Sequence, residues 1–260
     1  MKVKIKKKGK TKQFKLISKW SDVTLEKWLK LIDYNNGTKS SEALNTIAEL
    51  SNIPKKLIKE LELKDIAAIM SAVSELQKKQ DSSLKKIIEI KGKKYGFHPN
   101  LEEITLGEWS DLETMFTKGI ENHMPEIMSI LYRPVTDETA NGIYTIAAYD
   151  GNISIRAEQM KKMSAEQVQS ALVFFLSFRE RIVNDFAIIF DGSHEGNETA
   201  VATESFAEKW GYFGIMYRLC NADISKLEQI TKLNLLEAFT WLSYETDLNS
   251  QNKVKHGSQQ

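Results

Sequence analysis

The sequence predicts an α+β fold that is predominantly helical, with three short antiparallel β-hairpins that are each followed by an amphipathic helix. Two observations support this prediction: three glycine turns lie between strand-like segments, and a similar helix-start signature follows each of them. With 260 residues, the chain can bury a sizeable core as one large domain or as two modest ones.

The three predicted hairpins turn at Gly9, Gly92 and Gly151, each of which follows a lysine or an aspartate. The flanking segments carry β-branched or aromatic residues, often at every second position, as strands require. These segments are "KVKIK" and "KQFKLI", then "KKIIEI" and "KYGFH", and finally "IYTIAAY" and "ISIRA". Glycine adopts the positive φ of a tight hairpin turn without steric cost.

Three helix starts follow these turns, in the segments "VTLEKW", "ITLGEW" and "MSAEQV". Thr24, Thr105 and Ser164 are suitable N-caps, and Glu108 and Gln167 complete two capping boxes. The even spacing suggests a repeated hairpin–helix unit, although a chance match between the first two copies is an equal alternative. Further helices are predicted over 40–51, 55–80, 121–132 and 165–188.

Shifts in composition divide the chain into five parts. Two of them hold the hairpin–helix units, the third reads as a polar linker, the fourth as an aromatic-rich helical segment and the last as a disordered tail. Their bounds are 1–83, 84–190, 191–203, 204–248 and 249–260.

Charge is distributed unevenly along the chain. Residues 1–19 hold nine lysines and no acidic residue, which leaves 27 basic and 35 acidic side chains, or −8, in the remainder. This pattern fits either a solvated edge hairpin or a contact with an acidic partner. The lysines that would make such a contact are Lys6, Lys7, Lys8, Lys10 and Lys12. Nucleic acid is a weaker alternative, because only Phe14 offers a stacking ring there.

Motifs for catalysis and cofactor binding are missing from the sequence. The run "KKGKTKQF" ends like a phosphate-binding loop, but Lys4 stands where that loop requires its first glycine. The four histidines lack the spacing of a metal site, and the cluster "DGSHEG" lacks the central serine of a nucleophile elbow. We therefore expect no catalytic, cofactor-binding or metal site, and a protein that is not an enzyme.

One cysteine, Cys220, excludes an internal disulfide and favours a reducing compartment. The N-terminus is charged from residue 2, and the most apolar run, "ALVFFLSF", is too short to span a bilayer. A cytoplasmic protein without a membrane partner is therefore expected.

The segment 204–248 is unusually aromatic for its size, so it is expected to pack on the main body or on a partner chain. The residues predicted for a partner interface are Phe206, Trp210, Phe213, Tyr217, Phe239, Trp241 and Tyr244. A second copy of the chain is one candidate partner.

Four stretches carry a resemblance to a known family: "YGFHPNLEEITLGEWSDLE", "MPEIMSILYRPV", "MKKMSAEQVQSALVFF" and the ending from Trp210 to Asn249. They resemble small virion-associated proteins of tailed bacteriophages, most closely those labelled tail assembly chaperone or tail or baseplate assembly protein. The most recognisable pattern is W-G-x-x-G-x-x-Y-x-L, followed by L-x-Y-E-x-D at 242–247.

The resemblance implies a bacteriophage assembly protein that acts through protein–protein interfaces in the host cytoplasm. Its partners would be the tape-measure protein or neighbouring tail or baseplate proteins, since such chaperones are thought to coat the tape-measure protein. The alternatives are a structural component of the head–tail or tail region of the virion and, from a different class, a nucleic-acid-binding protein that uses the lysine hairpin.

Overall fold

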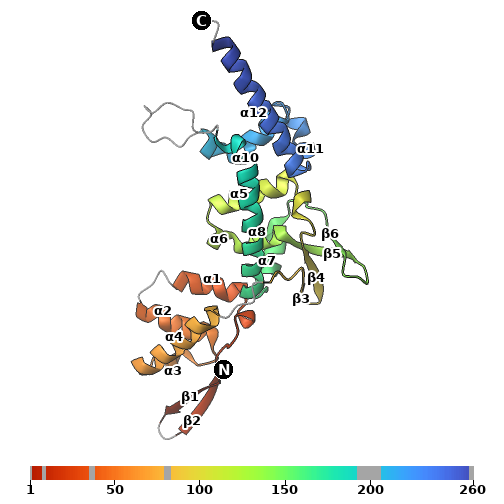
Figure 1. Cartoon of the computed structure of the whole chain (residues 1–260). Helices are drawn as coiled ribbons and strands as arrows, with labels where there is room; N and C mark the ends of the chain where they lie inside the picture. The colour runs from red at the N-terminus through yellow and green to blue at the C-terminus, as the bar shows by residue number, and fades with distance from the viewer. Residues whose placement is uncertain (1, 8–9, 35–38, 79–82, 192–205, 258–260) are drawn as a thin grey trace.

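A computed structural model describes residues 2–7, 10–34, 39–78, 83–191 and 206–257. The fold is α+β and predominantly helical, with two small antiparallel sheets. In Figure 1 a two-stranded hairpin lies at one end of the molecule, and the last helix, α12 (Leu235–Gly257), extends from the opposite end.

The N-terminal part contains the hairpin of β1 (Lys2–Lys7) and β2 (Lys10–Lys15) and four helices. These are α1 (Leu25–Tyr34), α2 (Lys39–Leu50), α3 (Lys55–Ile58) and α4 (Leu63–Lys78), preceded by the short 3-10 turn η1 (Trp20–Asp22). The chain turns between α3 and α4, so the single helix predicted over 55–80 is wrong. Their apolar faces meet in a core of their own around Trp20, Ile47 and Leu50.

A four-stranded sheet lies in the second part, with all neighbours antiparallel in the order β3-β4-β5-β6. Its strands are β3 (Ile87–Ile90), β4 (Lys93–Phe97), β5 (Tyr132–Glu138) and β6 (Tyr144–Ile146). The turn between β3 and β4 has positive φ at Lys91 and Gly92, as a type I′ hairpin requires. The second predicted hairpin is therefore confirmed. The first is present as β1–β2, although Gly9 lies outside the described residues.

The third predicted hairpin, around Gly151, is wrong. The segment before it, β6, pairs back onto β5 through a turn at Gly142, and the segment after it is the helix α7 (Ile153–Met160). Ala157 and Met160 of α7 are buried, so helical spacing gives this segment a core-facing side that a short strand would not.

The predicted N-caps at Thr24, Thr105 and Ser164 are all present, and both predicted capping boxes form. They begin α1, α5 (Leu106–Thr117) and α8 (Ala165–Asp185). A fourth cap, Asn234, begins α12, and its side chain accepts hydrogen bonds from the N–H groups of Leu236 and Glu237. This cap was not predicted from the sequence.

The four caps pair with one another as two short antiparallel bridges, Thr24 with Ser164 and Thr105 with Asn234. In the first, the N–H groups of Leu25 and Ala165 donate to the carbonyls of Met163 and Val23, both at 2.7 Å. The second repeats this reciprocal pattern at 2.9 Å, through Leu106 and Leu235. Each bridge provides partners for first-turn N–H groups that a helix leaves unbonded. The similar segments "VTLEKW" and "ITLGEW" thus each contribute one cap to a bridge. Asn234 takes part in the same kind of pairing although no hairpin precedes its helix.

The main core lies where α5, α8 and α12 converge. Trp109 is fully buried there, with its ring about 6 Å from those of Phe175, Phe178 and Phe239. The helix α6 (Ile120–Leu131) passes directly into β5, so Pro134 lies in a strand.

The C-terminal part follows α9 (Ala187–Asp191) and contains α10 (Phe206–Leu219), the turn η4 (Ile224–Lys226), α11 (Leu227–Thr231) and α12. The predicted linker 191–203 lies outside the described residues except for its first residue. The prediction of a disordered tail over 249–260 is wrong as far as Gly257, because α12 continues to that residue.

Candidate functional site: an aromatic face on the C-terminal helices

The helix α12 has two different apolar sides. One side carries Phe239 and Leu242, which are fully buried and complete the main core. The other side carries Trp241, Tyr244 and Leu248, which are 66%, 66% and 42% exposed. The spacing i, i+3, i+7 aligns these three side chains along one stripe of the helix.

The helix α10 repeats this division. Tyr212, Ile215, Met216 and Leu219 pack against the main core, whereas an outer stripe of Trp210, Phe213 and Tyr217 is about half exposed. The rings of Trp210 and Phe213 lie 5.8 Å apart. Gly211 has φ 45° and kinks the helix between Trp210 and Tyr212, a conformation that a residue with a side chain rarely adopts.

An ion pair joins the two helices beside these stripes. Arg218 Nε donates to Glu245 Oε2 at 2.9 Å, and Arg218 Nη2 donates to Thr246 Oγ1 at 3.3 Å. Arg218 directly follows Tyr217, and Glu245 directly follows Tyr244. We call the six exposed residues the aromatic face: Trp210, Phe213, Tyr217, Trp241, Tyr244 and Leu248.

Five of the seven residues predicted for a partner interface therefore belong to the aromatic face. Phe239 does not and is a correction, because its ring packs against Trp109 and lies 5.4 Å from Phe186 inside the core. Phe206 begins α10, but its side chain lies outside the described part. Leu248 was not predicted, although it continues the spacing of Trp241 and Tyr244.

The lysine hairpin is the second predicted contact region. Lys12 is exposed, as are Lys2, Lys4 and Lys15, while Val3 and Phe14 pair across the strands and pack toward the N-terminal core. The hairpin thus has an apolar side formed by Val3, Ile5 and Phe14 and a basic side formed by Lys2, Lys4 and Lys15, while Lys12 pairs with Ile5 and lies at the exposed part of the apolar side. Lys8 lies outside the described residues, and Lys6, Lys7 and Lys10 lie on strands whose side chains at these positions are not described.

A buried charged cluster, which the sequence did not reveal, lies under the sheet. Glu108 of the capping box is 1% exposed and meets Arg133 of β5, with 2.5 Å between Oε1 and Nη1. His98 Nε2 lies 3.9 Å from the same carboxylate oxygen. Burial lowers the pKa of His98 below 6.5 and outweighs the opposite effect of Glu108. Glu108 was identified only as a capping residue, since no sequence spacing links it to Arg133.

A groove of about 1030 Å³ opens beside this cluster, and we call it the acidic groove. Its lining includes Glu103, Asp111, β6 and part of α11. The Tyr149 hydroxyl donates to Asp111, and burial is the main cause that raises the pKa of this tyrosine. A hydrogen bond from Arg156 lowers the pKa of the neighbouring Asp150 to about 2.

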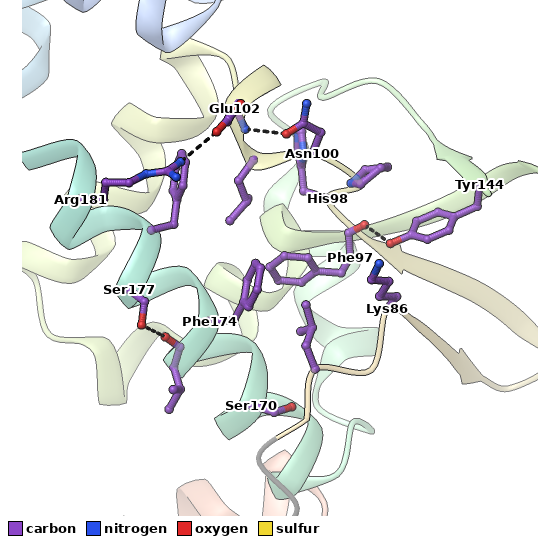
Figure 2. A pocket seen from close by; sticks show the side chains of 15 residues that line it. Lys86, Phe97, His98, Asn100, Glu102, Tyr144, Ser170, Phe174, Ser177 and Arg181 are labelled. Carbon is purple, nitrogen blue, oxygen red and sulfur yellow. Dashed lines mark hydrogen bonds and ion pairs between the residues drawn. The ribbon is translucent and has the colours of Figure 1, made fainter. Parts of the chain in front are cut away.

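A second cavity, of about 570 Å³, lies between β4 and α8 (Figure 2). The rings of Phe97 and Phe174 meet edge-on in it with 5.6 Å between centroids, and the Tyr144 hydroxyl donates to the Phe97 carbonyl. Its two serines also use their hydroxyls for the backbone: Ser170 donates to Gln167 and Ser177 to Val173. The cavity is thus mainly apolar, and these hydroxyls are engaged in helix hydrogen bonds.

Among the residues described, no three or more histidine, cysteine or acidic side chains are placed to hold a metal ion. Cys220 is buried, and its thiol points to the Tyr217 carbonyl at 3.4 Å. The described helices include none with the length and apolarity needed to cross a membrane.

No protein-family model, curated protein or solved structure matches this chain. The arrangement of the side chains in the described residues therefore has to indicate where this chain could bind a partner. The aromatic face is the feature of that arrangement with the clearest chemistry, since large apolar rings exposed on two joined helices suit a protein contact.

Proposed function

We propose that this protein is a non-enzymatic bacteriophage assembly protein that binds an apolar helical segment of a tail or baseplate protein through its aromatic face. The observation that carries the proposal is the exposure of Trp241 and Tyr244, at 66% each, on a helix whose opposite side completes the core. The helix is held firmly by one side, so the other is presented in a fixed orientation.

The residue types of the aromatic face support a binding role. Tryptophan and tyrosine are enriched among the interface residues that contribute most binding free energy, because they bury a large area with few rotatable bonds. The spacing i, i+3, i+7 of Trp241, Tyr244 and Leu248 on α12 is also the spacing by which helices recognise helical partners. The exposed end of α12, which extends from the body in Figure 1, leaves room for such a partner beside it.

The phage assignment is supported by where the resembling residues lie. Trp210, Tyr217 and Tyr244 belong to the pattern by which the chain resembles tail assembly proteins, and all three belong to the aromatic face. A residue whose only role was to pack the core would not lie on the exposed outer stripe of its helix. Within the phage class, an assembly chaperone that shields apolar parts of the tape-measure protein fits this surface best.

The test is a binding measurement with the purified tape-measure protein of the same phage. Replacement of Trp241, Tyr244 and Leu248 together by serine should weaken the affinity at least about 100-fold, because residues of this kind contribute about 2 kcal/mol or more each at interface centres. The helical circular-dichroism signal should not change. A matched control replaces three scattered exposed residues, Leu63, Ile155 and Ile224, by serine and should bind as the wild type does.

Equal affinity of the aromatic-face variant and the wild type would refute the proposal. Deletion of 204–248 is unsuitable as a test, since it also removes Leu235 and Phe239 from the core. Mass spectrometry of mature particles separates the two phage roles: a chaperone is absent from them, whereas a structural component is retained.

A further inference from the structure

We propose that copies of this protein associate head to tail, with the lysine hairpin of one copy bound in the acidic groove of the next. The hairpin and the groove are separate from the aromatic face, so this association goes beyond the proposed function and does not depend on it. The occupant of the groove is a second copy of this chain because the chain itself supplies a complementary charge.

The hairpin offers a concentrated positive charge. Residues 2–15 contain eight lysines and no acidic residue. Lys2, Lys4, Lys12 and Lys15 are exposed, whereas Val3 and Phe14 pack toward the N-terminal core and hold the two strands on the body. The backbone N–H of Asn52 donates to the Lys15 carbonyl at 3.1 Å and fixes the base of the hairpin.

The acidic groove offers an excess of negative charge. Five carboxylates line it, against one arginine and one lysine, and burial favours the neutral form of the histidine beside them. Glu108 faces Arg133, Glu228 faces Lys232, and Asp150 pairs with Arg156 at 2.7 Å, so those three charges are balanced locally. Glu103 and Asp111 instead accept hydrogen bonds from neutral groups, the Asn100 amide and the Tyr149 hydroxyl, so these two carboxylates are the ones placed to meet the lysines of a partner.

The geometry of the chain separates the hairpin from its own groove. In Figure 1 the hairpin lies at the lower end of the molecule, whereas β6, which lines the groove, lies higher on the body. One copy thus presents a basic projection and an acidic recess at different places. Pairing between unlike surfaces is heterologous, and it produces a closed ring when the rotation closes and a filament otherwise.

The shape of the groove border also suits a hairpin. The strand β6 is the last strand of its sheet, so its outer edge is a site where another strand can be added. The exposed residues Ile143 and Thr145 flank Tyr144 on this edge. Charge brings the hairpin to the groove, and the strand edge can then align it.

Sedimentation velocity of the full chain over a range of concentrations tests this inference. The sedimentation coefficient should rise with concentration at 50 mM salt, and the association constant should fall at least about tenfold by 500 mM, because salt shortens the screening length below the spacing of these charges. The variant Lys4→Glu/Lys12→Glu/Lys15→Glu should remain monomeric. Lys55→Glu/Lys56→Glu/Lys59→Glu, which changes exposed lysines elsewhere, should associate as the wild type does.

Charge reversal in the groove provides the deciding experiment. Glu103→Lys/Asp111→Lys should also be monomeric alone, but an equimolar mixture with the hairpin variant should associate again, since each charge then meets its opposite. A mixture that stays monomeric overturns the inference, as does a wild type that is monomeric at every salt concentration. Hairpin variants that lose binding to duplex DNA yet still self-associate would assign the lysines to nucleic acid instead.

Discussion

The helices α5 and α12 begin in the same way and end in different surroundings. Their caps, Thr105 and Asn234, pair in one bridge, and each helix contributes a tryptophan soon afterwards. Trp109 of α5 is fully buried among aromatic rings, whereas Trp241 of α12 is 66% exposed. The same residue type therefore stabilises the core in one helix and is available for a partner in the other.

This difference arises from helical position and not from composition. Phe239 and Trp241 are two residues apart, which places them about 200° apart around the helix axis. Phe239 faces Trp109 and is fully buried, so Trp241 must face away from the core. The aromatic content of a segment therefore does not show which of its residues belong to the core and which to the surface. That distinction requires the buried side of the helix to be known.

The largest expected effect separates these two neighbours. Phe239→Ala should lower the free energy of unfolding by about 3–5 kcal/mol, because it leaves a cavity beside Trp109. Trp241→Ala should change it by less than about 0.5 kcal/mol, as substitutions at exposed positions usually do. Urea denaturation of both variants measures the contrast. Similar losses at the two positions would show that the outer side of α12 is also packed.

The next effect compares a buried ion pair with an exposed one. Glu108→Gln should lower the free energy of unfolding by about 3 kcal/mol, because it leaves the Arg133 charge buried without its counterion. Glutamine still accepts the N-cap hydrogen bond, as Gln167 does in α8. The matched control is Glu245→Gln on α12, where both partners are 38% exposed, and it should cost less than about 1 kcal/mol. Equal losses would contradict the contrast between the two regions.

The smallest effect concerns pH. Burial keeps the pKa of His98 below 6.5, so the unfolded chain takes up this proton first as the pH falls below 6.5. The free energy of unfolding should therefore decrease below that pH, by at most about 1.4 kcal/mol per pH unit for one proton, and be unaffected by His98 above it. His98→Gln should flatten this decrease between pH 6.5 and 5.

Local signals predicted much of the fold. The caps at Thr105 and Ser164 and the turn at Gly92 were predictable because a few neighbouring residues determine each of them. The prediction of a hairpin at Gly151 was wrong, because a glycine turn can also precede a helix. Only the pairing of β6 with β5 excludes a hairpin partner strand after Gly151. The pairing of Asn234 with Thr105 spans 129 positions, and no local signal reports it.

The candidate site was predictable in part for a similar reason. Composition identified the aromatic segment, but Phe239 was included because its burial depends on Trp109, far away in the sequence. The contact between Glu108 and Arg133 depends on the placement of β5 beside α5, which the sequence did not indicate. Long-range packing thus decides which aromatic and charged side chains remain for a partner.

The most direct test of the proposed docking role of the aromatic face is photo-crosslinking from single positions of this protein in phage-infected cells. A photoreactive phenylalanine in place of Tyr244 should form a covalent adduct with one tail protein, whereas the same residue at Ile155, which is 75% exposed on α7, should not. An equal yield of adducts at the two positions, or no adduct from Tyr244 while the tail assembles normally, would contradict the account.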